Sequence, residues 1–187
     1  EQKRAELQAR FSWHPGVKVY AGDVRDGERL VDIFAGVECV IHAAARKRVS
    51  GHHDEPREML LTNVLGTQNV MAAARAAGVR KLLFISSDKA VHPQNVYGIS
   101  KALAEHLVIS ENARAWAGGL RLSVIRYGNV LASNGSVVRM WRERLARGAR
   151  LQISDPAMTR FWLTLDDAVG YVLHALGNMR GGEVFVP

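Results

Sequence analysis

The chain has 187 residues, 48% of them hydrophobic, and a formal net charge of +7. This length is enough to bury one good core, so we expect a single domain over residues 1–187. No apolar run approaches the roughly 20 residues that span a bilayer, and the charged N-terminal end does not resemble a signal peptide. The single cysteine, Cys39, excludes an internal disulfide and indicates a reducing compartment, which predicts a cytoplasmic protein. Because Cys39 sits in an apolar run, we expect a buried thiol.

The positive charge leaves three kinds of partner open: nucleic acid, an anionic membrane surface, and a small polyanionic substrate. The densest basic run lies over residues 139–150, where arginines recur at helical spacing with only Trp141 as an interleaved aromatic. We interpret this run first as a solvated helix face and second as a contact for a substrate diphosphate. Nucleic acid comes third, because the run lacks the aromatic side chains on which bases stack.

Apolar periodicity, caps and chain breakers predict a regular succession of elements. Asp26 is a good N-cap for the second helix, and Gly78 is a natural stop after the third. In chain order we expect helix 1–10, strand 17–20, helix 28–34, strand 38–45, helix 54–77, strand 80–86, helix 96–117, strand 120–127, helix 136–147, strand 151–153, helix 165–176 and strand 183–186.

Strands and helices therefore alternate at βαβ spacing. The predicted fold class is α/β, a Rossmann-like doubly wound parallel sheet. The strands are continuous apolar runs, which suits a parallel sheet covered by helices on both faces. No repeat, low-complexity tract or linker places a domain boundary inside the chain.

Residues 82–107 hold the densest group of chemically active side chains. A buried strand runs into a loop with Ser87, Asp88 and Lys89, and a helix then opens near Tyr97. Tyr97 and Lys101 are four residues apart and share one face of that helix. An ammonium group near a phenol stabilises the phenolate, so we expect Lys101 to lower the pKa of Tyr97 from about 10. Tyr97 then becomes a plausible proton-transfer group near neutral pH.

Three separated motifs together resemble one enzyme family. The first is Ser86 and Ser87 followed by Tyr97-x-x-x-Lys101, within SSDKAVHPQNVYGISK; the others are RYGNVLASNGSVV over 126–138 and ISDPAMTRFWLTL over 153–165. They resemble the extended short-chain dehydrogenase/reductases, in the branch of nucleotide-sugar 4,6-dehydratases and epimerases. The sequences of these motifs are most similar to those of the inverting UDP-N-acetylglucosamine 4,6-dehydratases of bacterial surface-polysaccharide biosynthesis.

The resemblance implies oxidation of a sugar at C4, elimination of water across C5–C6, and return of the hydride to C6. It assigns Tyr97 to the C4 hydroxyl, with Lys101 holding the nicotinamide ribose. Ser87 stands where the family often has Thr and keeps a hydroxyl for the C4 oxygen. Asp88 would be the acid for the departing C6 oxygen, and Lys89 the base at C5.

Two alternatives stay open. A nucleotide-sugar 4-epimerase would share Ser87, Tyr97 and Lys101 but needs no elimination pair, so Asp88 and Lys89 favour dehydration. A non-catalytic fragment of either enzyme is the other alternative.

The resemblance also implies a cofactor, NADP or NAD, and a nucleotide-diphosphate sugar as substrate, with no nucleic-acid partner. It further implies a homo-oligomer for the intact protein and a substrate-binding region over about 134–165, where Asn134 replaces an Arg common in the family. The implied cofactor-binding residues are Asp23, Val24, Ala43, Ala44, Ala45, Lys47, Asn63, Tyr97, Lys101, Tyr127, Gly128, Asn129 and Val130. The implied substrate-binding residues are Asn129, Ser136 and Arg160.

Neither G-x-G-x-x-G nor G-x-x-G-x-x-G occurs in the sequence. In the resembled family a Gly-rich turn and a first βαβ unit precede the segment that begins here, and the chain continues further. The resemblance therefore implies an incomplete sheet that lacks its first two strands, in a piece of a larger enzyme that also continues beyond residue 187. In a sheet of order 3-2-1-4-5-6 the absent strands would lie between 17–20 and 38–42. The run HHDE at 52–55 looks like metal ligands, but adjacent side chains diverge and no second cluster follows at ligand spacing, so we expect no metal site.

Overall fold

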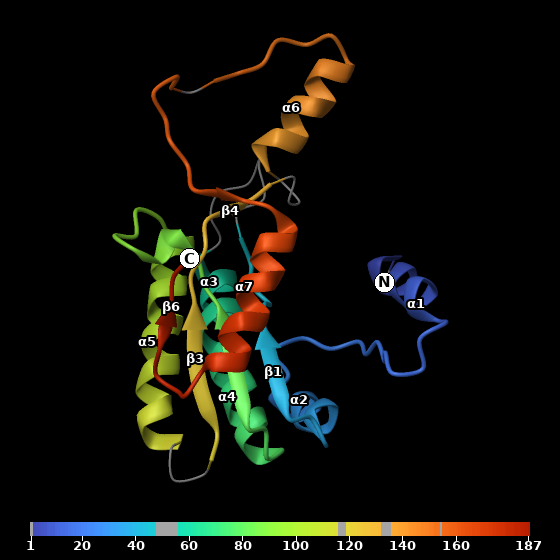
Figure 1. The fold of residues 1–187 in the computed structure, drawn as a ribbon, viewed down its shortest axis with the longest axis vertical. Helices are drawn as coiled ribbons and strands as arrows, with labels where there is room; N and C mark the ends of the chain where they lie inside the picture. The colour runs from blue at the N-terminus through green and yellow to red at the C-terminus, as the bar shows by residue number, and fades with distance from the viewer. Residues whose placement is uncertain (1, 48–55, 116–118, 132–135, 154) are drawn as a thin grey trace.

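The computed structural model describes residues 2–47, 56–115, 119–131, 136–153 and 155–187. Its main sheet has the strand order β1-β2-β3-β6, and each neighbouring pair is parallel. Figure 1 shows this sheet between helical layers, so the prediction of an α/β fold with a parallel sheet is confirmed. The strands are β1 (Cys39–His42), β2 (Lys81–Ile85), β3 (Arg121–Ile125) and β6 (Val184–Phe185).

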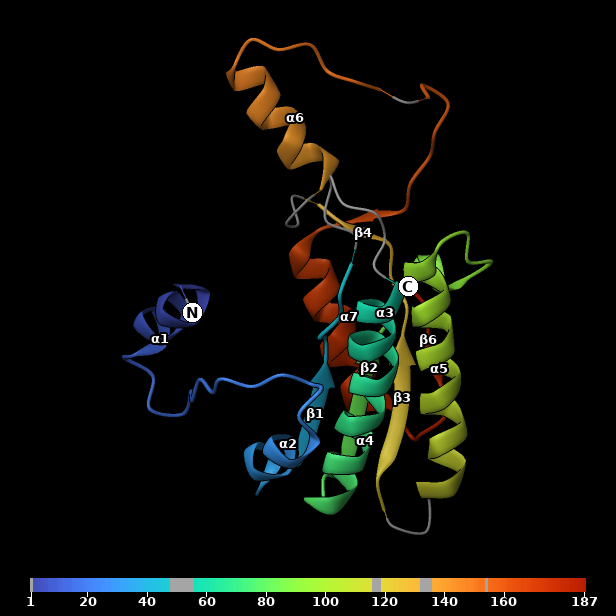
Figure 2. The same cartoon turned by 180° about the vertical axis from the view of Figure 1, so that it is seen from behind.

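Helices lie on both faces of the sheet. α4 (Gly66–Ala76) and α5 (Val96–Ala115) cover one face, and α7 (Leu165–Asn178) covers the other (Figure 1, Figure 2). α2 (Gly27–Phe34) packs on α4, and the carboxylate of Asp26 caps α2 by accepting a hydrogen bond from the Arg29 N–H. The remaining α-helices are α1 (Gln2–Phe11), α3 (Pro56–Met59) and α6 (Val137–Ala146).

The helix predicted over 54–77 contains a feature that periodicity does not reveal. Between α3 and α4 the described chain passes through a π-helical turn, η1 (Leu60–Leu65), which holds the buried Asn63. π-turns inside helices often mark functional positions. The turn after α4 ends on Gly78 with φ +73°, as the predicted glycine stop requires.

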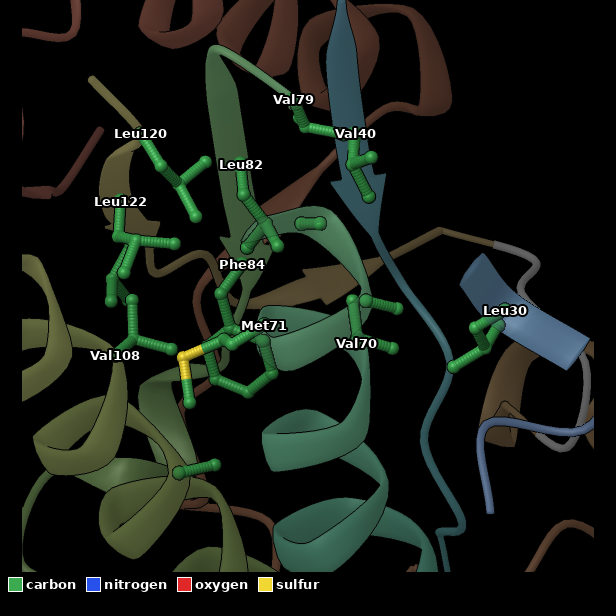
Figure 3. Close-up of a cluster of buried hydrophobic side chains, with 14 residues drawn as sticks. Leu30, Val40, Val70, Met71, Val79, Leu82, Phe84, Val108, Leu120 and Leu122 are labelled. Atoms are coloured by element: carbon green, nitrogen blue, oxygen red, sulfur yellow. The ribbon is translucent and has the colours of Figure 1, made fainter. Parts of the chain in front are cut away.

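The core gathers on both faces of β2 and β3. Leu82, Phe84 and Leu122 are at most 1% exposed and pack toward α4 and α5 (Figure 3). Alternate side chains of the same strands, Leu83 and Ile125, pack on the opposite face with residues of α7. Full burial of a side chain of this size contributes about 1.5–3 kcal/mol. The two central strands are therefore a firm base for the loops at their carboxyl ends.

Two predicted strands do not form. Residues 17–20 and 151–153 are irregular and mostly exposed, and no strand lies beside either segment in the described chain. An isolated extended segment has no partner for its backbone hydrogen bonds and gains little stability in water. The predictions of strands over 17–20 and 151–153 are wrong for this structure.

Coverage of β1 also differs from expectation. Val40 and His42 are buried on the α4 side, but Ile41 is 44% exposed and Cys39 is an exposed thiol. The prediction that Cys39 is buried is therefore wrong. The apolar run suggested two covered faces, whereas helices of the described chain cover only one face of β1.

A second sheet was not anticipated. β4 (Asn129–Val130) pairs in parallel with β5 (Trp162–Leu163), more than 30 residues later. This two-stranded ribbon leads to α6, which projects away from the main sheet (Figure 1). Within the described residues, no helix is long and apolar enough to cross a membrane.

Candidate active site

The first part of the site is the turn that follows β2. A single 3-10 turn, η2 (Asp88–Ala90), begins at Ser87, whose Oγ accepts a hydrogen bond from the Lys89 N–H at 3.3 Å. The Asp88 N–H donates to the Tyr127 carbonyl at 3.1 Å, which ties this turn to the chain after β3. Both loops lie at the carboxyl ends of parallel strands, where α/β sheets bind ligands.

The predicted elimination pair is in direct contact. Lys89 Nζ donates to Asp88 Oδ1 at 2.9 Å and to Asn129 Oδ1 at 3.2 Å. Ser87 Oγ also donates to Asp88 Oδ1, at 2.9 Å. The structure thus brings the predicted residues Ser87, Asp88, Lys89 and Asn129 into one hydrogen-bonded group.

Tyr97 joins this group from the first turn of α5. The neighbouring Ser87 hydroxyl lowers the pKa of Tyr97. Burial is the larger effect and, with the charge of Asp88, holds the pKa of Tyr97 above its usual value. The prediction that Lys101 lowers the pKa of Tyr97 is therefore wrong for this structure.

Lys101 is buried beneath the site and has partners of its own. Its Nζ donates to the Ile85 carbonyl at 2.5 Å and lies 3.9 Å from the centre of the Phe84 ring. Burial lowers the pKa of Lys101 to about 8, partly opposed by the charge of Glu105. Glu105, one turn further along α5, forms a bidentate ion pair with Arg126 at the end of β3. Sequence reasoning missed Glu105, although its i+4 spacing from Lys101 was a usable signal.

A buried polar network supports the neighbouring backbone. Asn63 accepts a hydrogen bond from the Arg46 N–H at 2.6 Å, and its Nδ2 donates to the Arg46 carbonyl and to Ser100 Oγ, both at 2.9 Å. Thr67 Oγ1 donates to the Asn63 carbonyl, so the contact of 2.9 Å with His42 Nε2 makes His42 the donor there. Burial lowers the pKa of His42 to about 3. His42 and Thr67 were not predicted, because a single His in an apolar strand carries no distinctive pattern.

The other predicted cofactor residues occupy two loops. Ala43, Ala44, Ala45 and Lys47 lie on the exposed loop after β1, which the amide of Asn63 fastens at Arg46. The second loop precedes α2 and carries two further predicted residues. There the carboxylate of Asp23 forms an ion pair with Arg25, which lowers the pKa of Asp23, and the Val24 carbonyl accepts a hydrogen bond from Asn69.

The motif over residues 153–165 packs against the motif over residues 126–138 at Gly128. A Cβ at Gly128 would lie 2.5 Å from the Phe161 carbonyl oxygen, so only glycine allows the chains to approach this closely. Beside it, the Asn129 N–H donates to the same carbonyl at 2.8 Å. Tyr127 and Val130 flank this contact, and burial raises the pKa of Tyr127.

Three polar atoms near these loops are buried without a hydrogen-bond partner among the described residues: Ser86 Oγ, Asn129 Nδ2 and Ser136 Oγ. Buried polar groups normally have partners, so such atoms are candidates for ligand contacts.

Some predicted residues lie elsewhere. Arg160 is exposed, and its guanidinium donates to the adjacent Thr159 carbonyl, so no described contact joins it to the Asp88 group. Asn134 and residues 52–55 lie outside the described residues. Within the described ranges, no cluster of three or more His, Cys, Asp or Glu side chains could hold a metal ion.

Comparison with known proteins shows the family of the chain. The family model described as "Polysaccharide biosynthesis protein" matches residues 1–187. The chain is 42% identical over 188 residues to the UDP-N-acetylglucosamine 4,6-dehydratase (inverting) of Campylobacter jejuni, covering 100% of this chain and 56% of the relative. It is also 42% identical over 186 residues to a UDP-glucose 4-epimerase of Rickettsia typhi, covering 54% of that protein. The chain thus spans about half the length of these relatives.

Solved structures show the same fold. Pen from Bacillus thuringiensis matches with a TM-score of 0.94 at 33% identity, over 99% of this chain and 59% of that one. The dTDP-glucose 4,6-dehydratase DesIV from Streptomyces venezuelae, solved with NAD and TYD bound, matches with a TM-score of 0.86 at 25% identity, over 98% of this chain and 61% of that one. With a parallel α/β sheet, the Ser87–Tyr97–Lys101 motif and a family match over its whole length, this chain belongs to the polysaccharide biosynthesis protein family, in the extended short-chain dehydrogenase/reductase branch.

Proposed function

We propose that the protein carrying this chain is an NAD(P)-dependent nucleotide-sugar 4,6-dehydratase that acts on UDP-N-acetylglucosamine in surface-polysaccharide biosynthesis. The observation that carries the proposal is the Asp88–Lys89 pair, joined by a hydrogen bond of 2.9 Å within the group that contains Ser87 and reaches Tyr97. The Campylobacter jejuni relative, named a UDP-N-acetylglucosamine 4,6-dehydratase, supports it.

Each of the four side chains has its own role in the proposed reaction. Tyr97 takes the proton of the C4 hydroxyl, and Ser87 holds the C4 oxygen by a hydrogen bond. A ketone at C4 acidifies the C5 proton, which Lys89 then removes. Asp88 protonates the departing C6 oxygen, so that water leaves. An acid and a base that touch each other suit an elimination across two adjacent carbons.

The described residues fit a nicotinamide dinucleotide. Ala43, Ala44 and Ala45 offer an exposed loop of small side chains. Lys101 lies buried one helical turn after Tyr97, with N–H donors beyond the one that it gives to the Ile85 carbonyl. Ser86 Oγ and Asn129 Nδ2 are buried and have no hydrogen-bond partner among the described residues. When bound, the dinucleotide would supply a hydride acceptor for C4 and a hydride donor for C6. The choice between NAD and NADP stays open.

The substrate contacts belong to the same proposal. Asn129 Nδ2 and Ser136 Oγ would donate to the nucleotide-diphosphate sugar, within a region of about 134–165. Arg160 would serve the diphosphate with its permanently charged, forked donor set. The cytoplasm as compartment and a homo-oligomer as assembly are part of the proposal, and light scattering of the full-length protein tests the latter.

The deciding experiment uses the full-length protein with cofactor and UDP-N-acetylglucosamine. Lys89→Ala should slow the loss of water by about 10²–10⁴-fold, the usual cost of one proton-transfer group. Hydride transfer in a single turnover should persist, so that reduced cofactor and a 4-keto sugar accumulate. Tyr97→Phe should instead give no reduced cofactor. Absorbance of the reduced nicotinamide and mass spectrometry of the sugar report these outcomes.

Lys18→Ala is the matched control, because Lys18 is exposed on a loop outside the site. It should leave both steps unchanged. If Lys89→Ala dehydrates at the unmutated rate, the role proposed for Lys89 is wrong.

The second candidate is a nucleotide-sugar 4-epimerase, favoured by the equal identity to the Rickettsia typhi protein of that name. The same experiment separates the two functions. If the unmutated protein forms a C4 epimer without loss of water, the epimerase function replaces the dehydratase function.

A further inference from the structure

A buried ion pair joins α5 to the end of β3. Glu105 is only 4% exposed, and its carboxylate accepts hydrogen bonds from Arg126 Nε at 3.0 Å and from Arg126 Nη2 at 2.5 Å. Neither side chain has a role in the reaction proposed above. Removing two charges from water is costly, so a buried ion pair is weak evidence for stability and can instead serve to hold elements in one arrangement.

Arg126 stands at the start of the chain that contacts the proposed elimination pair. The next residue, Tyr127, accepts a hydrogen bond from the Asp88 N–H at 3.1 Å through its carbonyl. Two residues further on, Asn129 Oδ1 accepts a hydrogen bond from Lys89 Nζ at 3.2 Å. Both members of the elimination pair are therefore bonded to the chain that directly follows Arg126.

We propose that Glu105 and Arg126 are positioning residues for the elimination step. Their ion pair anchors the segment 126–129 to α5, and this segment in turn holds Asp88 and Lys89 in place. The proposal rests on the dehydratase function proposed above.

The surroundings of the ion pair suit an anchor. α5 packs on β3 (Figure 1, Figure 2), and Ala104 and Val108, on either side of Glu105 in the sequence, are fully buried. The backbone of Arg126 is held separately, because its N–H donates to the Phe185 carbonyl at 2.9 Å. A guanidinium that meets a carboxylate with two hydrogen bonds fixes direction as well as distance. The start of the segment 126–129 is therefore fixed relative to α5.

The oxidation step depends less on this segment. Tyr97 lies on α5 itself, and η2, which begins after Ser87, packs directly against α5. A looser segment 126–129 would withdraw support from Lys89 while Tyr97 keeps its place. The proposal therefore predicts that loss of the ion pair slows elimination more than oxidation.

The first test measures both steps in single turnovers of the full-length protein, with saturating cofactor and UDP-N-acetylglucosamine. Arg126→Lys is the deciding variant, because it keeps both charges and removes the forked pair of hydrogen bonds. Loss of water should slow about 10–10²-fold more than hydride transfer, since a misplacement of about 1 Å can cost about 10²-fold. Glu105→Gln should shift the ratio of the two rates in the same direction. It is the supporting variant, because it also removes a charge that raises the pKa of Lys101.

Both rates are measured on the same folded molecules, so their ratio does not depend on how much of a variant folds. Glu38→Gln is the matched control. It removes an exposed ion pair with Arg80, and these two residues directly precede β1 and β2, at the end of the sheet opposite the site. This variant should leave the ratio unchanged.

A second readout needs neither cofactor nor substrate. Hydrogen exchange of the full-length protein, followed by NMR, reports the bond between the Asp88 N–H and the Tyr127 carbonyl. In Arg126→Lys the Asp88 amide should exchange about tenfold faster, because that bond opens more often. The amide of Leu83, in the buried centre of β2, reports global unfolding and corrects for any change in overall stability.

The outcomes separate the anchor from the function on which it rests. If Arg126→Lys slows both steps by the same factor, or slows neither, the ion pair does not position the elimination pair and the proposal is wrong. Unchanged exchange of the Asp88 amide would also overturn it, since the Tyr127 contact would then be independent of the ion pair. If the unmutated protein removes no water from the sugar, the dehydratase function has failed and the role in elimination falls with it. Faster exchange of the Asp88 amide would still support the anchor in that case.

Discussion

Burial shifts the pKa values of several ionisable side chains near the site. Lys101, Tyr97 and His42 each have a pKa moved toward the neutral form, with desolvation as the largest cause. His42 has the simplest surroundings, since its ring donates to Thr67 and lies 5.4 Å from the Phe84 ring. Its neutral state is therefore built into the fold.

We predict that this neutrality limits stability in acid. The pKa of His42 is about 3 in the folded chain and about 6.5 when unfolded. Between these values only the unfolded state binds the proton, so the free energy of unfolding falls as pH decreases from about 6.5 to about 3. The expected slope is about 1 kcal/mol per pH unit. Urea denaturation at several pH values measures it.

His42→Gln keeps a donor for Thr67 and removes the titration, so its stability should depend less on pH over this window. His106→Gln changes an exposed histidine and should keep the unmutated slope. Equal slopes for His42→Gln and the unmutated chain would contradict the prediction.

At the scale of single residues, Ser87, Asp88, Lys89 and Asn129 could be predicted as site residues from the sequence, and the structure does bring them together. The sequence could not give the direction in which the pKa of Tyr97 is shifted. Spacing along one helix places Lys101 on the same face as Tyr97, but the depth of burial depends on what packs over that face. Lys101 instead reaches a strand carbonyl, a contact that needs tertiary structure to be seen.

At the scale of the element, the start of α5 packs against η2, the turn that carries Asp88 and Lys89. A Cβ at Gly98 would lie 2.3 Å from the Lys89 carbonyl oxygen, closer than atoms can approach. The helix therefore packs directly against η2, and this packing sets the distance from Tyr97 to Ser87. A glycine beside Tyr97 is needed here for space.

We predict opposite effects for two glycine-to-alanine changes in helices. Gly98→Ala forces η2 away from α5, so it should destabilise the chain and weaken contact between Tyr97 and Ser87. The expected loss of unfolding free energy is about 1–3 kcal/mol, typical of overpacking. Gly170→Ala in α7 meets no atom within 4 Å, and should stabilise by about 0.5–1 kcal/mol because alanine favours helices. Urea denaturation measures both; a stabilising Gly98→Ala would overturn the packing argument.

The long elements could be predicted from the sequence, and the short ones could not. The buried runs over β2 and β3 and the capped helix α2 carry strong local signals. The β4–β5 ribbon has two residues per strand and depends on Gly128 meeting Phe161, so local pattern cannot reveal it. The opposite error occurred at residues 17–20, where a local strand pattern was present but no partner strand lies beside it in the described chain.

At the scale of the whole molecule, the residues proposed to bind the cofactor lie in the loops after β1 and β3, in the loop before α2, and on α5. The 187-residue sequence contains no glycine-rich turn of the G-x-x-G-x-x-G type, which would bring backbone N–H groups to a pyrophosphate. We predict that this chain by itself binds NAD(P) weakly or not at all. Isothermal titration calorimetry measures this, with the full-length protein as the positive control. Low-micromolar binding by the 187-residue chain would contradict the prediction.

The net charge of +7 leads to a further prediction, for nucleic acid. The arginines of α6 lie on an exposed helix without a buried residue, and Arg139 pairs with Glu143 on the same helix. This is consistent with a solvated helix face. Any affinity for DNA or RNA should therefore be weak and should disappear at moderate salt. Fluorescence anisotropy with a labelled oligonucleotide measures it, and sequence-preferring binding that survives roughly 0.2 M salt would refute the prediction.

The contrast between α6 and the central strands has a consequence for hydrogen–deuterium exchange. No residue of α6 is buried, whereas Leu82, Leu83 and Leu122 are fully enclosed between helices. Backbone amides of α6 should therefore exchange through local opening within a short labelling time. Amides of β2 and β3 should exchange only when the whole sheet unfolds. A ligand that docks against α6 would thus be visible as slowed deuterium uptake there while the sheet stays unchanged.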